Sequence, residues 1–398
     1  MIWSAQQERA LRKVREWLAS RDRPYFTLAG YAGTGKTTLA QELASGIGGD
    51  VYFAAFTGKA AHVLRRTGIL SASTIHRLIY LPRDKCGQKL ASLQAEHGRL
   101  LARVPRSQKE IADVERDIQR EQKNLSRPEF TLNTDSPLAT AALCVVDEYS
   151  MIDRQMGSDL LSFGCPVLAL GDPGQLPPID GERFFDKKPD VMMDEILRQA
   201  ADNPIIRLSK DVREGRALRP GTYGKSRVVR RGNVSDDELG AMVLKADQLL
   251  LGMNRTRGQF NAYARELLGR GGKMPVVGDK LVCLRNNPDA GLLNGQTWFV
   301  GRVVDKGKHL QLSLCNDDGD RVECLSHPYR FLVVSKNFDP RRFREHNDFD
   351  YGYALTVHKA QGSQWDKVVL IDEWRMAKRR EWLYTGITRA AESIVVIQ

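Results

Sequence analysis

The chain has 398 residues and a formal net charge of +11, with 42% hydrophobic and 27% charged residues. This length allows two or three domains with cores of their own, and the composition is that of an ordinary soluble protein. No apolar run approaches the length of a membrane span, and the opening residues lack the layout of a signal peptide. The six cysteines are scattered without a CxxC pair, which disfavours a zinc site and predicts a reducing, cytoplasmic setting.

The positive charge is concentrated in one part of the chain. Residues 196–285 contain 18 Lys and Arg against 9 Asp and Glu, an excess of 9 that accounts for most of the net charge. Such a region favours a polyanionic partner, most simply nucleic acid. Charge alone leaves open the alternative of a generically basic surface.

The first expected helix leads into a glycine-rich stretch. Ser4 and Gln7 form a capping box, which predicts a helix to about residue 19. Residues 26–40, FTLAGYAGTGKTTLA, then predict a strand, a phosphate-binding loop and a helix. Glycines let backbone N–H groups turn inward around an anion, and the helix N-terminus adds positive potential. Lys36 is expected to reach the β- and γ-phosphates of ATP, and Thr37 to hold Mg²⁺. The candidate nucleotide-binding residues here are Gly33, Thr34, Gly35, Lys36, Thr37 and Thr38.

Two further segments suit contacts with a nucleic-acid backbone. A second strand over residues 51–56 ends at Thr57, Gly58 and Lys59 and leads into a helix. Residues 71–76, SASTIH, form a hydroxyl-rich turn before a short helix. Small and cationic residues at a strand end can seat a phosphate, although each segment alone is better explained by a plain loop.

The composition changes between residues 82 and 137. A leucine stripe over residues 90–104 is followed, after Pro105, by a capping box of Ser107 and Glu110 and a second apolar stripe. This predicts an antiparallel helical hairpin inserted into the first core, each arm ~25 Å long for seventeen residues. The second arm has five basic and five acidic residues over 106–123, so we do not expect it to grip DNA, and a solvated spacer remains the alternative.

The core is expected to resume with a buried strand over residues 142–146. It delivers Asp147, a candidate Mg²⁺ ligand, and Glu148, which would orient and deprotonate the attacking water. The strand over 166–170 leads to Gln175, placed to hydrogen-bond a γ-phosphate. Strands alternating with helices predict a parallel α/β sheet with its site at the strand carboxyl ends.

The pattern shifts to short strands after residue 278. Turn signals at Asn294-Gly295 and residues 317–319 separate them, which predicts a small β-barrel. The core should return at residues 350–355 and close with a strand over 394–397. The expected short strands cover residues 280–284, 297–304, 309–314, 321–325 and 331–334.

Eight segments resemble, in order, the helicase motifs of superfamily 1. They read GYAGTGKT, AAFTGKAA, STIHRL, VVDEYSMID, GDPGQLPPI, EILRQAADNPI, YALTVHKAQGSQWD and LYTGITRA. Their wording is similar to the B branch, the RecD-like and Dda-like DNA helicases of bacteria and phages. The resemblance covers both ends of the chain. It implies two RecA-like cores stacked around one ATP, single-stranded DNA lying across both, and 5′-to-3′ movement.

The resemblance also implies roles for single residues. Arg198 and Arg389 match motif arginines that reach the γ-phosphate across the cleft, where a guanidinium stabilises developing charge. Gln7 matches the glutamine that reads adenine, although Gln6 lies beside it. The expected catalytic residues are therefore Lys36, Glu148, Gln175, Arg198 and Arg389. The expected DNA-binding residues are Thr57, Lys59, Thr74, His76, Thr356 and His358.

We therefore expect an α/β chain of two RecA-like parallel-sheet cores with two insertions. The expected first core covers residues 1–81 and 138–190, with the helical insertion at 82–137. The expected second core covers 191–277 and 346–398, with the small β-barrel at 278–345.

The expected function is that of an ATP-dependent DNA helicase. Relatives generally carry a β-hairpin wedge where this chain has the predicted helical pair. The alternatives are thus a nucleic-acid-stimulated ATPase or translocase with little unwinding, and a nucleic-acid-binding scaffold whose ATPase has decayed. Expected partners are single-stranded and forked duplex DNA and replication or recombination proteins, with no membrane. A monomer in the bacterial cytoplasm or a phage-infected host is expected.

Overall fold

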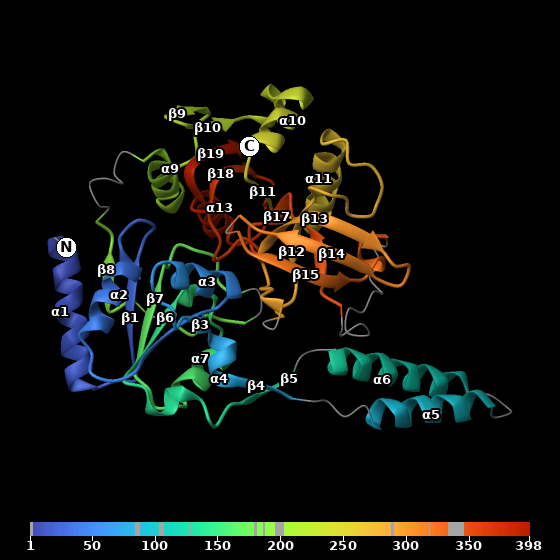
Figure 1. The fold of residues 1–398 in the computed structure, drawn as a ribbon. Helices are drawn as coiled ribbons and strands as arrows, with labels where there is room; N and C mark the ends of the chain where they lie inside the picture. The colour runs from blue at the N-terminus through green and yellow to red at the C-terminus, as the bar shows by residue number, and fades with distance from the viewer. Residues whose placement is uncertain are drawn as a thin grey trace. The chain divides into compact units, whose positions relative to one another are not determined.

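The computed structural model divides into two units, Met1–Ile75 with Pro137–Gln398, and His76–Ser136 (Figure 1). No helix within the described residues is long and apolar enough to cross a membrane. The described residues are 3–83, 88–102, 107–126, 129–178, 181–185, 188–195, 203–287, 290–317, 319–332 and 346–398.

The first sheet is parallel throughout and has the strand order β3-β2-β6-β7-β1-β8. Its strands are β1 (Tyr25–Gly30), β2 (Val51–Ala55), β3 (Ser73–Thr74), β6 (Leu143–Asp147), β7 (Val167–Gly171) and β8 (Val191–Met193). Residues of α1 (Ala5–Ser20), α2 (Lys36–Ser45) and α3 (Gly58–Arg66) share one apolar cluster with strands β1, β2, β6 and β7. The short helices η1 (Pro137–Thr140) and η2 (Tyr149–Met151) flank β6, and α7 (Arg154–Leu161) precedes β7. The central strands are buried along their length, as expected for a sheet covered on both faces.

The first core extends further than predicted. Strand β8 pairs with β1, with Leu28 opposite Val191, so residues 191–193 belong to the first sheet and not to the second core. The preceding Asp190 fixes this register, because its Oδ2 accepts hydrogen bonds from the Thr27 N–H at 2.7 Å and the Thr27 hydroxyl at 2.8 Å. The predicted boundary at residue 191 is therefore wrong.

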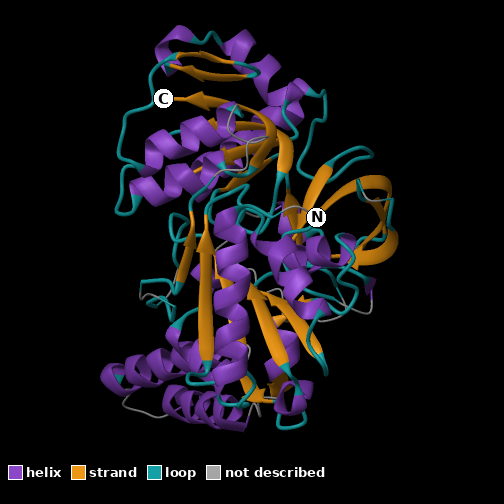
Figure 2. Cartoon of the chain, turned by 90° about the vertical axis from the view of Figure 1, so that its left-hand side faces the viewer, coloured by secondary structure: helices purple, strands orange, loops and turns teal. Residues whose placement is uncertain are grey.

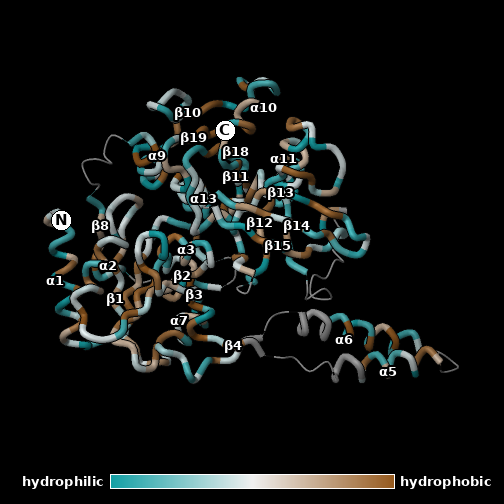
Figure 3. Tube along the Cα trace, in the orientation of Figure 1, coloured by the Kyte–Doolittle hydropathy of each residue, from teal (hydrophilic) through white to brown (hydrophobic). Residues whose placement is uncertain are grey.

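The second sheet has the order β17-β11-β18-β19-β10-β9, parallel except for the edge strand β9. Its strands are β9 (Gly221–Tyr223), β10 (Ser226–Val229), β11 (Gln248–Leu251), β17 (Ala354–Thr356), β18 (Trp365–Ile371) and β19 (Ala390–Ile397). Side chains alternate across it: Leu250 faces the cluster of α9 (Pro204–Arg213) and α13 (Arg379–Ile387), whereas Leu249 and Leu251 face that of α10 (Asp236–Lys245) and α11 (Asn254–Leu267). The short helix η3 (Arg231–Asn233) precedes α10. Helices line the strands in Figure 2, and hydrophobic residues gather along the strands in Figure 3.

A third, antiparallel sheet follows the order β15-β14-β13-β12-β16 and forms the predicted small barrel. Its strands are β12 (Lys280–Cys283), β13 (Thr297–Asp305), β14 (Leu310–Cys315), β15 (Arg321–Ser326) and β16 (Phe349–Tyr351). A bridge between Ser326 and Asn347 draws its two edges together. Two predictions here are wrong. Strand β16 belongs to this sheet rather than to the core, because it pairs with β12. A strand was predicted at residues 331–334, but residues 331 and 332 belong to the helix α12 (Tyr329–Leu332). Pro328 directly precedes this helix and favours its first turn. Residues 333 and 334 lie outside the described ones.

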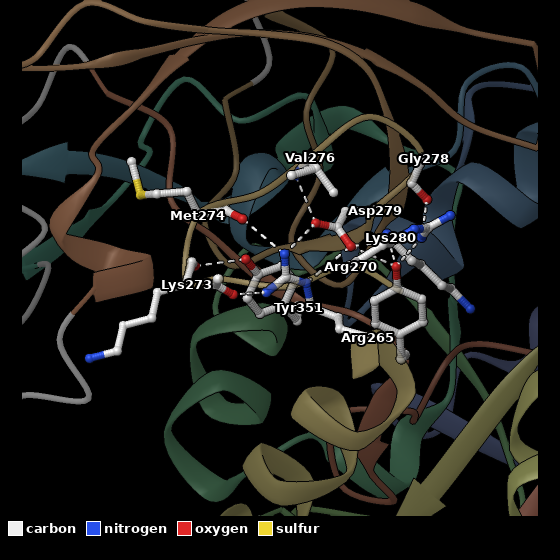
Figure 4. A network of polar contacts seen from close by, with 11 residues as sticks. Arg265, Arg270, Lys273, Met274, Val276, Gly278, Asp279, Lys280 and Tyr351 are labelled. Atoms are coloured by element: carbon white, nitrogen blue, oxygen red, sulfur yellow. Dashed lines mark hydrogen bonds and ion pairs between the residues drawn. The ribbon is translucent and has the colours of Figure 1, made fainter. Parts of the chain in front are cut away.

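A buried ion pair joins this barrel to the second core (Figure 4). Asp279, which is fully buried, accepts from Arg265 Nε at 3.1 Å and from the Val276 N–H at 2.8 Å. Arg265 belongs to α11 and also donates to the carbonyls of Gly272 at 2.6 Å and Met274 at 2.9 Å. Each nitrogen of the guanidinium and each oxygen of the carboxylate thus has a partner, which helps a buried pair to offset its desolvation.

The second unit contains the predicted helical pair, α5 (Gln88–Ala102) and α6 (Gln108–Ser126). His97 of α5 lies 3.1 Å from the Glu115 carboxylate of α6. The unit also contains an antiparallel pair of strands that was not predicted, β4 (Tyr80–Arg83) and β5 (Glu129–Leu132). In the chain, the two helices therefore lie between the paired strands β4 and β5, which form a two-stranded stem. The short helix α4 (Ile75–Ile79) precedes β4. Pro105, at the predicted tip, lies outside the described residues.

Candidate nucleotide site and the contacts between the cores

The phosphate loop connects β1 to α2 as predicted. Gly33 and Gly35 adopt φ angles of 79° and 80°, in the left-handed region that favours glycine. A Cβ at Gly30 would lie 2.6 Å from Thr34 Oγ1, so only glycine fits there. Helix α2 begins at Lys36, so its N-terminal N–H groups point into the loop. Thr38 follows in the first turn with an exposed side chain.

Lys36, Thr37 and Asp147 lie together at the strand ends. Lys36 Nζ donates to the carbonyls of Gly30 at 2.7 Å and Tyr31 at 3.0 Å, and Thr37 Oγ1 donates to Asp147 Oδ2 at 3.4 Å. Burial, with the neighbouring Glu148 charge, raises the pKa of Asp147 to about 6, whereas Lys36 lowers it. A hydroxyl and a carboxylate suit Mg²⁺, which takes one or two protein oxygens beside substrate phosphates. Among the described residues, no three His, Cys, Asp or Glu side chains gather as a separate metal site.

Glu148 has a backbone conformation that is uncommon for its residue type. Its φ of 59° and ψ of 45° are left-handed, which costs roughly 1–3 kcal/mol for a residue with a Cβ. Its N–H donates to Asp147 Oδ1 at 2.8 Å, which holds the turn directly after β6. Strain of this kind persists where the surroundings enforce it, often at functional sites.

Gln175 connects Glu148 of the first core with Arg389 of the second. With its amide oriented as its neighbours require, Gln175 donates to Glu148 Oε2 at 3.0 Å and accepts from Arg389 Nη2 at 3.3 Å. Gln175 is 5% exposed and Arg389 6% exposed, so both are shielded from solvent. Two predicted catalytic residues from the first core and one from the second therefore form one chain of polar groups.

The other hydrogen bonds of Arg389 are made within the second core. Arg389 Nε donates to the Thr385 carbonyl at 3.1 Å and Nη1 to the Ser363 carbonyl at 3.2 Å, which directs the guanidinium toward Gln175. Arg198, the other predicted arginine, lies outside the described residues.

The two neighbouring glutamines of α1 have different partners. Gln7 is 6% exposed, and its Nε2 donates to the Thr34 carbonyl in the phosphate loop at 3.2 Å. Gln6 instead binds the segment after β8, accepting from the N–H groups of Asp194 at 3.1 Å and Glu195 at 2.8 Å. Gln7 is thus the glutamine that faces the phosphate loop.

Two of the predicted DNA-binding residues, Thr57 and Lys59, lie against the second core. Thr57 Oγ1 caps α3 by accepting from the Ala60 N–H at 3.1 Å, and a Cβ at Gly362 would come within 2.8 Å of that hydroxyl. Lys59 Nζ lies 4.5 Å from the centre of the Trp365 ring. Thr57 and Lys59 therefore meet the loop that precedes β18.

The other predicted DNA-binding residues are more scattered. Thr356 ends β17 and is 5% exposed, and its hydroxyl accepts from the Lys359 N–H at 3.3 Å. The His358 ring lies 5.2 Å from Trp374, and burial lowers its pKa. Thr74 ends β3 beside β2. His76 belongs to the second unit, where its ring lies 5.6 Å from Tyr80.

Sequence reasoning missed several residues that bring the cores together. Tyr31, inside the phosphate loop, packs against the apolar cluster of the second core, and its ring centre lies 3.4 Å from the Arg213 guanidinium carbon. Asp172 and Tyr384 form a hydrogen bond between the cores. Asp172 and Tyr384 stood in quoted motifs without a role, whereas Arg213 was one of 18 basic residues in its region. No short-range pattern pairs residues so far apart in the chain.

Residues 3–233 match the family model of the AAA domain, and residues 351–397 match the UvrD-like helicase C-terminal domain. The chain is 28% identical to the ATP-dependent RecD2 DNA helicase of Deinococcus radiodurans, over 92% of this chain and 46% of that protein. It is 25% identical to the conjugal transfer protein TraA of Agrobacterium fabrum, over 63% of this chain and 24% of that protein. The chain thus spans about half the length of the first of these relatives and about a quarter of the second.

Solved structures agree on the fold. Bacteroides Pif1 bound to single-stranded DNA superposes with a TM-score of 0.54 at 18% identity, covering 100% of this chain and 92% of that chain. A Pif1 helicase structure concerned with unwinding of forked duplex DNA gives 0.55 at 17% identity, with the same coverage. These likenesses show the RecA-like fold. The AAA domain model matches more than half of the residues, so the chain belongs to the AAA domain family.

Proposed function

We propose that the chain is an ATP-dependent DNA helicase that moves 5′ to 3′ along a single strand and hydrolyses ATP between its two RecA-like cores. The observation that carries this proposal is the polar chain from Glu148 through Gln175 to Arg389, which links the two sheets beside the phosphate loop. Because residues of both cores take part, the rate of ATP hydrolysis depends on how the two cores are placed relative to each other. Movement of the cores during hydrolysis would then move a DNA strand that contacts both of them.

The residues of the site divide the work. Lys36, which now donates to two loop carbonyls, would turn to the β- and γ-phosphates, and Gln7 would contact the adenine. Thr37 and Asp147 would hold Mg²⁺, which when bound neutralises charge on the phosphate oxygens. Glu148 would accept the proton of the attacking water, with Gln175 holding its carboxylate in place. Arg389, and Arg198 by its motif, would stabilise the charge that develops on the γ-phosphate.

The proposed DNA path uses Thr57, Lys59, Thr74, His76, Thr356 and His358. Thr57 and Lys59 lie where the first core meets the loop before β18, so a strand bound there would contact both cores. Contacts of this type go mainly to phosphates, which makes affinity strongly dependent on salt and tolerant of sequence.

The test is unwinding of duplexes with either a 5′ or a 3′ single-stranded tail, with and without ATP and Mg²⁺. We expect ATP-dependent strand separation on the 5′-tailed duplex, and Lys36→Ala should abolish ATP turnover and unwinding together. Activity only on the 3′-tailed duplex would contradict the direction. ATP turnover unchanged by Lys36→Ala would contradict the assigned site.

A translocase with little unwinding activity is the second candidate. The observation that favours it is the inserted unit, in which a two-stranded stem carries a pair of helices. The second arm has five basic and five acidic residues over 106–123, so it offers no net positive charge to hold a displaced strand. Displacement of a protein block from single-stranded DNA, without separation of a forked duplex, would favour this candidate over a helicase.

A further inference from the structure

One buried hydrogen bond joins the two cores directly behind Gln175. The Tyr384 hydroxyl, from α13 of the second core, donates to Asp172 Oδ2, just after β7 of the first core, at 2.6 Å. Each of these residues is 1% exposed. A carboxylate this deeply buried needs such partners, because its desolvation is costly.

Asp172 also shapes the turn that presents Gln175. Its Oδ1 accepts from the Gly174 N–H at 2.9 Å. The Tyr384 ring packs on the same glycine, where an added Cβ would lie 3.1 Å from a ring carbon. Burial raises the pKa of Asp172, while Lys36, the Tyr384 hydroxyl and the Gly174 N–H oppose this by stabilising the carboxylate.

The second core holds this turn on both sides of Gln175. Beyond it, the Leu176 N–H donates to Thr385 Oγ1 at 2.9 Å, and the Leu176 carbonyl accepts from Gln361 Nε2 at 3.0 Å. Leu176 itself is buried in the apolar cluster of the second core. Gln175 therefore lies between two contacts with the opposite core, while Arg183 of the first core donates to the carbonyls of Pro173 and Gln175.

The same helix that anchors the turn also carries the arginine. Helix α13 presents Tyr384 to Asp172 and Thr385 to Leu176, and the Thr385 carbonyl accepts from Arg389 Nε. The separation of 3.3 Å between Gln175 and Arg389 thus depends on how α13 docks on the turn.

We propose that Asp172 and Tyr384 are positioning residues for ATP hydrolysis, whose hydrogen bond holds Gln175 between Glu148 and Arg389 only while the two cores are docked. The bond makes turnover depend on core closure without touching the substrate. This inference rests on the proposed function, because it requires that the chain hydrolyse ATP.

The test compares Tyr384→Phe with the intact chain in steady-state ATP hydrolysis with saturating single-stranded DNA. The ring and its packing on Gly174 remain, so only the hydroxyl is lost. We expect kcat to fall at least tenfold while KM for ATP changes less than threefold and the thermal midpoint is preserved within a few degrees. The matched control is Tyr223→Phe, in the same core, whose hydroxyl donates to the Arg219 carbonyl at 2.7 Å; it should keep the original kcat.

A double-mutant cycle with Asp172→Ala separates this role from general packing. If the hydroxyl acts through Asp172, Tyr384→Phe should have little further effect on kcat in the Asp172→Ala background. An unchanged kcat in Tyr384→Phe, or fully additive losses in the cycle, would overturn the positioning role while leaving the proposed function intact.

Asp172→Asn is a second variant that tests the same hydrogen bond if Tyr384→Phe does not fold. An Asn side chain can still accept from Gly174 and donate to the Tyr384 oxygen, so we expect kcat between those of the intact chain and Asp172→Ala. A kcat equal to that of Asp172→Ala would overturn the hydrogen-bond role. An intact chain that does not hydrolyse ATP would instead refute the proposed function, and the positioning role with it.

Discussion

The same dipeptide, Asp-Glu, stands at the end of a parallel strand in each core. Asp147 ends β6 in the first sheet and Glu148 follows it, whereas Asp372 and Glu373 both follow β18 in the second. The first pair lies beside Lys36 and Thr37 of the phosphate loop, and its Glu148 meets Gln175.

The second pair is used for structure. Asp372 accepts two hydrogen bonds from Arg379, at 2.7 and 2.6 Å. Glu373 Oε1 accepts from the N–H groups of Gly252 and Met253, both at 2.8 Å, and from Thr256 Oγ1 at 2.6 Å, at the start of α11. Carboxylates at strand ends therefore do not mark a site by themselves; only the first pair lies beside the loop that we propose binds the nucleotide.

The largest difference between the pairs should appear in catalysis. Glu148→Gln removes the proposed general base, so kcat for ATP hydrolysis should fall by about 10²–10⁴, with ATP still bound. Glu373→Gln is the matched control, because an amide oxygen can accept the same three hydrogen bonds, and its kcat should stay within about twofold of the original. Equal losses in the two variants would show that the comparison is wrong.

Dependence on Mg²⁺ should separate the two aspartates. Asp147→Asn weakens the proposed metal ligand set, so the Mg²⁺ concentration for half-maximal hydrolysis should rise at least about tenfold, roughly 1.4 kcal/mol. Asp372→Asn should leave that concentration unchanged and lower the thermal midpoint. A magnesium titration of both variants decides the matter, and an unshifted Asp147→Asn curve would remove Asp147 from the metal site.

For the free energy of unfolding, the second pair should matter more than the first. Glu373→Ala leaves two backbone N–H groups and a hydroxyl without their acceptor, so the free energy of unfolding should fall by about 1–3 kcal/mol. Glu148→Ala loses a side chain whose partner is Gln175, and a loss under about 1 kcal/mol is expected. Urea denaturation of both variants without nucleotide measures this. A Glu148→Ala variant less stable than Glu373→Ala would contradict this order.

A shifted pKa can likewise be structural. Burial lowers the pKa of Lys280 to about 8, and its ammonium donates to the Asp247 carbonyl and to Gln248 Oε1 in the second core. Between pH 8 and 10.5 the unfolded chain binds a proton that the folded chain does not, so this residue should make stability rise with pH. From pH 8 to 9.5 the intact chain should gain about 1.5 kcal/mol relative to Lys280→Met. Parallel stability curves for both proteins would contradict the shift.

The smallest effect is expected at the stack of Tyr31 and Arg213. Arg213→Ala removes a cation–π contact of about 0.5–1 kcal/mol between the cores, so KM for ATP should rise about two- to fivefold. Arg207→Ala, on the same helix, is the control, because its guanidinium lies 5.9 Å from the Tyr223 ring, away from the phosphate loop. A KM raised equally in both variants would point to a general effect on α9.

Local patterns predicted the parts of the site that local chemistry builds. The capping box of Ser4 and Gln7, the glycines of the phosphate loop and the strand before Asp147 all formed as expected, because each depends on residues a few positions apart. The fold class and the small barrel followed from the same kind of reading.

Pairings between distant segments were not predictable in the same way. Strand β8 joined the first sheet because Asp190 binds Thr27, and β4 paired with β5 across the helical insertion, although Pro82 argues against a strand. The contacts of Asp172 with Tyr384 and of Tyr31 with Arg213 arise only once two cores are docked. A sequence shows which residues such contacts could use, and tertiary packing selects the pair.

The most direct test of a nucleotide site shared between the two sheets is a crystal structure of the full chain with ADP, aluminium fluoride, Mg²⁺ and single-stranded DNA. We expect the Arg389 guanidinium and the Gln175 amide within hydrogen-bond distance of the fluoride that takes the place of the γ-phosphate. The Glu148 carboxylate should lie beside the water that would attack this phosphate. A fluoride contacted by residues of the first core alone, with Arg389 still bonded only within its own core, would contradict the account.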